Sequence, residues 1–154
     1  MDRPRYKRVK TRKREYRLLT TTEAKELLDE QKVINHPFGW RMISSDRRRL
    51  EASVWVPSPS IEIKLYGNVG KTNYSFTLSY QGYCLRTYNV HFYHHNPDCN
   101  DIYEPHKHDW DERYGTKQAY VVHDISTDNI NSALKDFLKE CNIEALGGYQ
   151  QILL

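Results

Sequence analysis

Residues 74–93, YSFTLSYQGYCLRTYNVHFY, contain the clearest strand pattern in the chain. Tyr, Phe, Leu and Tyr at positions 74, 76, 78 and 80 alternate with Ser and Thr, which is typical of a strand with one buried face. The Gln-Gly pair that follows favours a tight hairpin turn. Residues 83–93 then continue as a long strand, so this stretch predicts an antiparallel hairpin at the centre of the fold.

Further strands are predicted on both sides of this hairpin. Residues 50–56 and 61–66 alternate apolar with polar side chains, and residues 118–122 have the composition of a strand. Pro57 and Pro59 end the first of these strands, because proline cannot donate a hydrogen bond to a sheet. The middle of the chain is therefore predicted to be an antiparallel meander.

A helix is predicted near each end of the chain. Thr20 and Glu23 form a capping-box pattern, and the helix that follows is expected to extend to about Lys32. A residue among 126–128 (Ser, Thr or Asp) is expected to cap the second helix. The apolar stripe of that helix is Ile130, Ala133, Leu134, Phe137, Leu138 and Cys141. This order predicts an α+β fold in which an N-terminal and a C-terminal helix pack on an antiparallel sheet of about five strands.

The length and composition favour one domain in a reducing compartment. A chain of 154 residues can bury a core without disulfides. It has only three cysteines, and this small, odd number argues against a disulfide framework. No apolar run reaches the length of a membrane span, and none follows the basic N-terminus as in a secretory signal. We therefore expect a cytoplasmic location and no membrane partner.

The charge of the chain is unevenly distributed. Residues 1–19 carry nine Lys and Arg side chains against two acids, although the net charge of the whole chain is only +3. This segment has no apolar periodicity, so we predict a flexible basic arm at residues 1–19 and a single α+β domain at residues 20–154. The arm's candidates for contact with nucleic acid or a partner are Arg8, Lys10, Arg12, Lys13 and Arg14. A second basic run lies at residues 47–49.

A histidine-rich segment covers residues 91–109, HFYHHNPDCNDIYEPHKHD, and contains five of the seven histidines. Imidazole and thiolate are ligands that zinc selects. His106 and His108 are two positions apart, so both rings face the same way in an extended segment. Together with His95 and Cys99 they supply four ligands, which is enough to close a tetrahedral zinc shell.

The ligand set can be composed in more than one way. His91 or His94 could take the place of His95, and Asp98 or Asp109 could supply the fourth ligand.

The role of the histidine-rich segment also has alternatives. Residues 96–116 show no helix or strand period, and a bound metal would hold so long a loop in place. Without a metal, His106 and His108 could act as the acid and base of a ribonuclease, or the loop could simply be solvated. Six carboxylates within residues 98–112 would repel a phosphate backbone, which favours a structural zinc over a ribonuclease.

Two resemblances bear on function. The run Asn96-Pro97-Asp98, followed by Pro105-His106-Lys107-His108 and then Ala119-Tyr120, resembles a small uncharacterised prokaryotic domain found in mobile-element and toxin-like settings. The whole chain, which is short, tyrosine-rich and basic at one end, also resembles phage-encoded anti-defence proteins, including metal-binding anti-CRISPR inhibitors of type II effectors. The second resemblance implies a stoichiometric inhibitor that binds a nucleoprotein effector.

The sequence therefore predicts a zinc-stabilised, non-enzymatic binding protein. Its acidic surface, with Asp109, Asp111 and Glu112, would contact a protein or nucleoprotein partner by electrostatic complementarity. The alternatives are a toxin-like ribonuclease that uses the histidines and a nucleic-acid-binding module that uses the basic arm.

Overall fold

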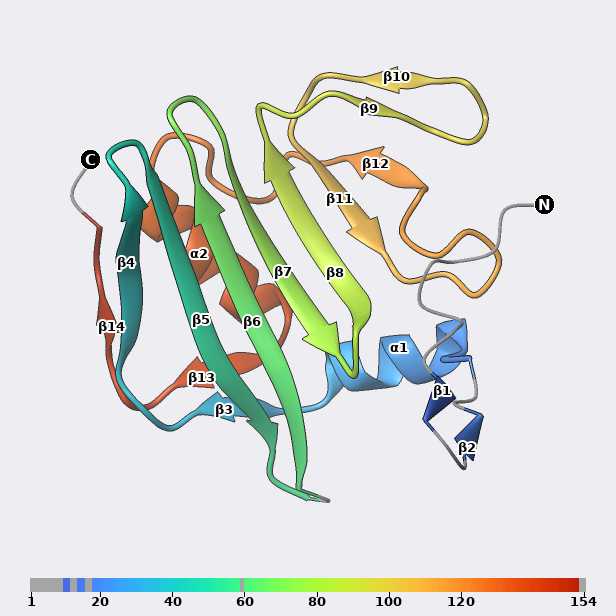
Figure 1. The fold of residues 1–154 in the computed structure, drawn as a ribbon, viewed down its shortest axis with the longest axis horizontal. Coiled ribbons are helices and arrows are strands. Elements are labelled where there is room, and N and C mark those ends of the chain that lie inside the picture. Colours follow the sequence, from blue (N-terminus) through green and yellow to red (C-terminus); the bar gives the residue numbers. More distant parts are fainter. Residues whose placement is uncertain (1–9, 12–13, 16–17, 59, 153–154) are drawn as a thin grey trace.

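The computed structural model describes residues 10–11, 14–15, 18–58 and 60–152 (Figure 1). The described residues form the helices α1 (Thr21–Asp29) and α2 (Ile130–Glu140). The longer strands are β4 (Phe38–Ser44), β5 (Arg47–Val56), β6 (Ile61–Val69), β7 (Tyr74–Tyr80) and β8 (Tyr83–Val90). The shorter strands are β1 (Lys10–Thr11), β2 (Arg14–Glu15), β3 (Lys32–Ile34), β9 (His94–His95), β10 (Asp101–Ile102), β11 (His106–Asp109), β12 (Ala119–Val121), β13 (Ile143–Ala145) and β14 (Tyr149–Gln150).

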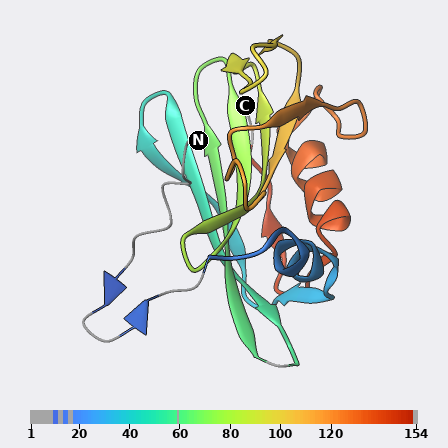
Figure 2. The same cartoon turned by 90° about the vertical axis from the view of Figure 1, so that its right-hand side faces the viewer.

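One large sheet organises the molecule. Its strand order is β12-β11-β8-β7-β6-β5-β3-β13, and β4 pairs with both β5 and β14. The pairs β13–β3 and β14–β4 are parallel, and the other pairs in the sheet are antiparallel. Both helices lie on one side of this sheet (Figure 2). The predicted α+β fold is confirmed, although the sheet has ten strands and not about five.

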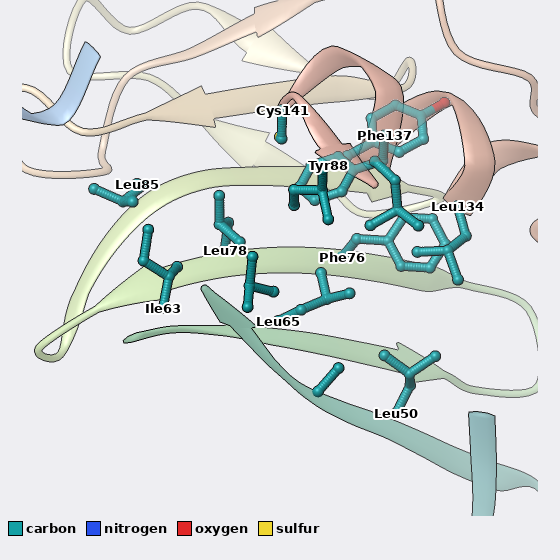
Figure 3. Packing of buried hydrophobic residues seen from close by; sticks show 14 of the residues in the cluster. Leu50, Ile63, Leu65, Phe76, Leu78, Leu85, Tyr88, Leu134, Phe137 and Cys141 are labelled. Carbon is teal, nitrogen blue, oxygen red and sulfur yellow. The ribbon is translucent and has the colours of Figure 1, made fainter. Parts of the chain in front are cut away.

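The core lies between α2 and the sheet (Figure 3). Alternate residues of β5 to β8 are buried, so each central strand turns its apolar side toward the helices. Leu134 and Phe137 of α2 pack over Phe76 and Tyr88 of the sheet, and the rings of Phe76 and Phe137 have centroids 5.8 Å apart. These four side chains are essentially inaccessible to solvent. Burial of this kind contributes about 25 cal/mol per Å² of apolar surface.

Helix α1 begins at the predicted capping box. The hydroxyl of Thr20 accepts a hydrogen bond from the N–H of Glu23 at 3.1 Å, and the Glu23 carboxylate accepts one from the N–H of Thr20 at 3.3 Å. These two bonds satisfy N–H groups that have no partner within the helix. Leu18 and Leu19, the last residues of the predicted arm, pack against the core.

Lys32 explains why α1 ends before its predicted limit. It begins β3 and is completely buried, and its ammonium donates three hydrogen bonds of 2.7 Å to the carbonyls of Leu28, Glu30 and Cys141. Burial lowers the pKa of Lys32 to about 8, so the group keeps its proton at neutral pH. Lys32 therefore joins the end of α1 to the end of α2.

Helix α2 is capped by Asn129 and not by a residue among 126–128. The side-chain oxygen of Asn129 accepts hydrogen bonds from the N–H groups of Asn131 at 2.8 Å and Ser132 at 3.2 Å. The predicted cap therefore lay one to three residues too early in the chain. The N–H of Ser126 donates instead to the Asp136 carboxylate of α2 at 3.0 Å.

The hairpin between β7 and β8 forms as predicted, but β8 is shorter than expected. Gln81 and Gly82 have φ values of 50° and 82°, as a tight turn between right-twisted strands requires. The strand ends at Val90 because His91 adopts a φ of 61°, which leaves the strand conformation. The histidines after position 90 therefore do not continue one face of β8.

The prediction that residues 96–116 lack strands is wrong. The strands β10 and β11 lie within this range. Three consecutive residues of β11, His106, Lys107 and His108, are buried, so both faces of the strand are covered. A polar strand with two covered faces has no apolar alternation for a sequence pattern to detect.

The remaining unpredicted strands are short or lie at the edges of the sheet. Strand β4, which was not predicted, begins at Phe38. Strands β3, β13 and β14 each have three residues or fewer. Among the described residues, no helix has the length and apolar content to cross a membrane.

Candidate functional site

The face of the sheet opposite the helices, called here the open face, carries polar side chains in register. Residues that pair across a sheet point to the same side of it. One row across five strands is Arg49, Asn68, Ser75, Asn89 and His106. Its side chains are exposed at the arginine end and buried at the histidine end.

A second polar row runs beside the first. It consists of Glu51, Tyr66, Thr77, Thr87 and His108. The hydroxyls of Thr77 and Thr87 are 3.2 Å apart, which confirms that this row is continuous at the centre of the sheet. No helix in the described part of the chain covers the rows (Figure 2).

A pocket of about 320 Å³, called here the arginine pocket, lies at the exposed end of the first row. Its lining residues are Ile43, Arg47, Arg48, Arg49, Asn68, Val69, Gly70, Asn73, Ser75 and Phe92. They come from the ends of β4 and β5, from the ends of β6 and β7 with the turn between them, and from the segment after β8, all at the same end of the sheet (Figure 1). None of the described lining residues is acidic. The second basic run of the sequence is therefore gathered around one hollow.

A histidine cluster, formed by His94, His106 and His108, lies at the other end of the open face. The ring centroids of His106 and His108 are 5.2 Å apart, as expected for alternate residues on one strand. The ring of His94, which comes from β9, lies 5.8 Å from that of His106 and 4.5 Å from that of His108. The hairpin β9–β10 thus contacts strand β11 of the large sheet through the ring of His94.

Each ring of the histidine cluster has one nitrogen beside a backbone carbonyl. These contacts are His106 Nδ1 to Glu104 at 2.9 Å, His108 Nδ1 to Thr116 at 2.6 Å and His94 Nε2 to Lys117 at 2.6 Å. A carbonyl only accepts, so these nitrogens carry the protons and the opposite nitrogens of the neutral rings are acceptors. Burial lowers the pKa of His106, and it lowers the pKa of His108 to about 4. Both rings are therefore neutral at pH 7.

The four predicted zinc ligands are not all brought together. His106 and His108 are neighbours, but His95 is exposed and its Nδ1 lies 2.6 Å from the Asp101 carboxylate. Cys99 is exposed in a turn and has a φ of 67°. Among the described residues, no group of three or more His, Cys, Asp or Glu side chains has an arrangement that could hold a metal ion. His94 occupies the place next to His106 and His108 that was predicted for His95.

Asn96, the first residue of the Asn-Pro-Asp run, holds the edge strand β12. Its side-chain N–H donates to the carbonyl of Ala119 at 2.9 Å, and its side-chain oxygen accepts from the N–H of the same residue at 2.8 Å. Asn96 is buried, so these bonds replace water for both of its polar groups. The sequence motif therefore has a structural explanation, which sequence reasoning missed because Ala119 is 23 residues away.

Lys107 lies between the two histidines and points to the helix side of the sheet. Although it is only 1% exposed, its ammonium is 3.0 Å from the Asp124 carboxylate and also contacts Glu140 of α2. Arg86 joins the same network, with 2.8 Å to Glu140 and 2.7 Å to Asp109. One oxygen of Glu140 is buried and lacks a hydrogen-bond partner among the described residues. The network ties β11 to α2.

The predicted acidic contact residues have mixed surroundings. Asp109 accepts hydrogen bonds from Arg86 and from the Tyr120 hydroxyl at 2.6 Å, and Asp111 accepts from two backbone N–H groups in a turn. Glu112 is exposed. Two of the three carboxylates therefore bond within the chain, and the acidic contact surface stays a prediction.

Most of the predicted contact residues of the basic arm lie outside the described residues. Lys10 and Arg14 belong to the antiparallel pair β1–β2, for which only the backbone is described. Arg8, Arg12 and Lys13 are outside the described residues. The binding role of the arm stays a prediction.

A family model matches residues 19–143. The chain belongs to the DUF6978 family. This family is one of unknown function, and no curated protein and no solved structure matches the chain. The DUF6978 match includes the arginine pocket and the histidine cluster, and it leaves out residues 1–18. Membership agrees with the predicted resemblance to an uncharacterised domain, whereas the mobile-element setting and the anti-defence role stay predictions.

Proposed function

We propose that this DUF6978 protein is a non-enzymatic binding protein that holds single-stranded nucleic acid on its open sheet face. The observation that carries the proposal is the arginine pocket, where Arg47, Arg48 and Arg49 line one hollow with no carboxylate among its described lining residues. Arginine is the side chain best suited to phosphate recognition, because its planar fork can donate two parallel hydrogen bonds.

The polar rows extend this pocket into a surface. Neighbouring strands lie about 4.8 Å apart, so the row from Arg49 to His106 covers about 19 Å across five strands. Asn68, Ser75 and Asn89 provide donors and acceptors along it. Half-buried Tyr66 and Phe92 offer aromatic rings, on which bases of any identity can stack. These features favour a chain of nucleotides over a flat protein surface.

The histidine cluster does not fit a ribonuclease. His106 is 0% exposed and its Nε2 lies 3.5 Å from the Asn89 side-chain amide, and His108 is 7% exposed, so both rings are shielded from a substrate in this structure. An acid and a base must lie within hydrogen-bond distance of the group they serve. The buried rings are better explained as part of the packing between β9 and β11.

Binding is tested with 12-nucleotide single-stranded RNA and DNA that carry a fluorophore at the 3′ end, using anisotropy over a series of salt concentrations. The variant R47A/R49A is compared with K25A/K135A, which removes the same charge from exposed positions on α1 and α2. We expect R47A/R49A to weaken binding at least about tenfold and to reduce the slope of log K against log salt by about 1.4, which is 0.7 for each lost phosphate contact.

K25A/K135A is expected to bind like the wild type, because its charges lie on the helix side of the sheet. Equal losses in the two variants would mean that binding follows net charge alone, and an absence of binding by the wild type at 50 mM salt would rule out the proposal.

A structural zinc ion is a second candidate, with His94 in place of His95. The observation that favours it is the set of carbonyl contacts, since metal-binding histidines commonly donate their other ring N–H to a backbone carbonyl. The placement of the side chains argues against it, because no three such ligands in the described part of the chain are arranged to hold a metal. Elemental analysis of purified protein, with thermal melting in the presence of chelator, decides: a zinc content below about 0.1 per chain and an unchanged melting temperature would exclude it.

A further inference from the structure

The three arginines of the arginine pocket gather positive charge at one point of the surface and do not spread it along a groove. Arg47 and Arg49 are alternate residues of β5, so they leave the strand on the same side, and Arg48 leaves on the other. All three nevertheless line the same pocket. The register of β4 and β5 shifts between Met42 and Ser44, beside these arginines, and such a bulge redirects side chains at the end of a strand. Three cations from both sides of one strand therefore surround a single hollow.

The walls of the pocket supply neutral hydrogen-bonding groups. The β6–β7 turn is closed by a 2.8 Å hydrogen bond from the N–H of Gly70 to the carbonyl of Asn73. The Asn73 side-chain oxygen lies directly over Gly70, where an added Cβ would come within 2.7 Å of it. Asn68 and Ser75 reach the pocket from the paired strands β6 and β7. A ligand with several acceptor oxygens can thus be bonded from more than one direction.

The lining also has an apolar part. Ile43, Val69 and Phe92 provide it, and Phe92 is half-buried. A volume of about 320 Å³ is at the lower end of the range for small-ligand sites, about 300–1,000 Å³. The pocket therefore has room for a phosphate together with the sugar or base attached to it, and Phe92 is placed to stack on that base.

The charge of the pocket distinguishes a terminal phosphate from an internal one. A phosphate monoester carries about −1.5 to −2 charges and three free oxygens at pH 7. An internal diester carries one charge and two free oxygens, so it is matched by single cations spaced along a strand. Among the described residues Arg47 and Arg48 make no ion pair, and Arg49 makes a long hydrogen bond of 3.4 Å to Asn68. Three such guanidinium groups around one hollow match a dianion.

We infer that the arginine pocket binds a terminal phosphate of a single-stranded nucleic acid, with the rest of the strand following the polar rows of the open face. This inference rests on the proposed function, because it names the group by which the strand is anchored. Arg47, Arg48 and Arg49 neutralise the phosphate, Asn68 and Asn73 bond its oxygens or the adjacent sugar, and Phe92 stacks on the adjacent base.

The test compares three 12-nucleotide oligonucleotides of one sequence, each labelled internally, with a 5′-phosphate, a 3′-phosphate or hydroxyls at both ends. The wild-type protein is titrated with each by anisotropy at 100 mM salt. We expect at least one of the phosphorylated strands to bind at least about tenfold more tightly than the hydroxyl-ended strand, since a charge-assisted hydrogen bond at one further oxygen accounts for such a factor. The preferred strand identifies the end that the pocket holds. Excess nucleoside monophosphate with its phosphate at that end should compete with the preferred strand.

Arg48→Ala is the informative variant, because it removes one guanidinium from the pocket and leaves the open face intact. We expect it to lose most of the preference for the terminal phosphate while it keeps its affinity for the hydroxyl-ended strand. Arg41→Ala is the matched control, since Arg41 lies on neighbouring β4, outside the pocket, and pairs with Glu51 at 3.6 Å. Thermal melting verifies that both variants are folded.

The outcomes separate this inference from the proposed function. Equal affinity of the wild type for all three strands, each reduced in R47A/R49A, would overturn the terminal-phosphate site and leave open-face binding intact. A preference for a terminal phosphate that Arg48→Ala leaves unchanged would also overturn it. If none of the strands binds, the proposed function itself fails.

Discussion

The two ends of the open sheet face differ in how fully their polar groups are bonded within the chain. At the histidine end, each ring of the cluster contacts a backbone carbonyl, and His106 and His108 are almost inaccessible. At the arginine end, Arg47 and Arg49 are exposed and make no ion pair among the described residues. Both ends are conspicuous in the sequence, but only the second has groups available to a ligand.

This difference shows that residue type alone does not identify a binding site. Five histidines in one segment are the stronger chemical signal, yet the structure uses two of them to fill the polar side of an internal strand. A buried polar group must be bonded within the protein to offset the loss of water, and bonding removes its capacity to bind anything else. The less unusual run of arginines keeps that capacity because it lies at the open end of the sheet.

The largest expected effect tests whether the histidine end is structural. Lys107→Met leaves the Asp124 carboxylate without its cation and Glu140 with Arg86 alone, so the free energy of unfolding should fall by about 3 kcal/mol in urea denaturation. Lys139→Met, at an exposed position of α2 next to Glu140, should change it by less than about 0.5 kcal/mol. Similar values for the two variants would contradict the role given to Lys107.

The pH dependence of stability sharpens the same contrast. The pKa of His108 is lowered to about 4 in the folded state, whereas an unfolded histidine titrates near 6.5. The unfolded chain therefore binds more protons between these values, and stability falls as the pH decreases from about 6.5 to 4, by on the order of 3 kcal/mol. Urea denaturation of the wild type and of His108→Gln at pH 7, 5.5 and 4.5 measures this contribution. A parallel decline in both proteins would mean that other groups cause it.

Asn96 should give an intermediate effect, because it holds an edge strand and not the core. Asn96→Ala removes both hydrogen bonds to Ala119 and leaves the backbone of β12 with buried, unbonded groups. We expect the free energy of unfolding to fall by about 2 kcal/mol, and hydrogen exchange to increase at Ala119 in particular. Asn100→Ala, at an exposed position of the same turn, is the control and should cost less than about 1 kcal/mol.

The smallest effect on stability is expected at the arginine end. The free energy of unfolding of R47A/R49A should be within about 0.5 kcal/mol of the wild type, because exposed side chains without ion pairs contribute little. Removing two neighbouring cations also relieves repulsion, which offsets part of any loss. A decrease of more than about 2 kcal/mol in the free energy of unfolding would show that these arginines stabilise the fold. The proposed difference between the two ends of the open face would then be wrong.

The sequence by itself determined the elements whose stability is local or whose pattern is strong. The capping box at Thr20 and Glu23, the tight turn at Gln81 and Gly82, and the alternating strands β5 to β8 all follow from interactions between residues close in the chain. The position of His106 and His108 on the same side of one strand was also predictable, since it needs only the two-residue repeat of a strand.

Only the tertiary structure decided what these elements do. It buried Lys107 against Glu140, 33 residues away, joined Asn96 to Ala119, and placed His94 where His95 was expected. It also gathered Arg47 to Arg49 with Asn73 and Phe92 into one pocket. These contacts depend on which strands become neighbours and which face each strand buries, and both are set by the packing of the whole chain and not by the pattern of any one segment.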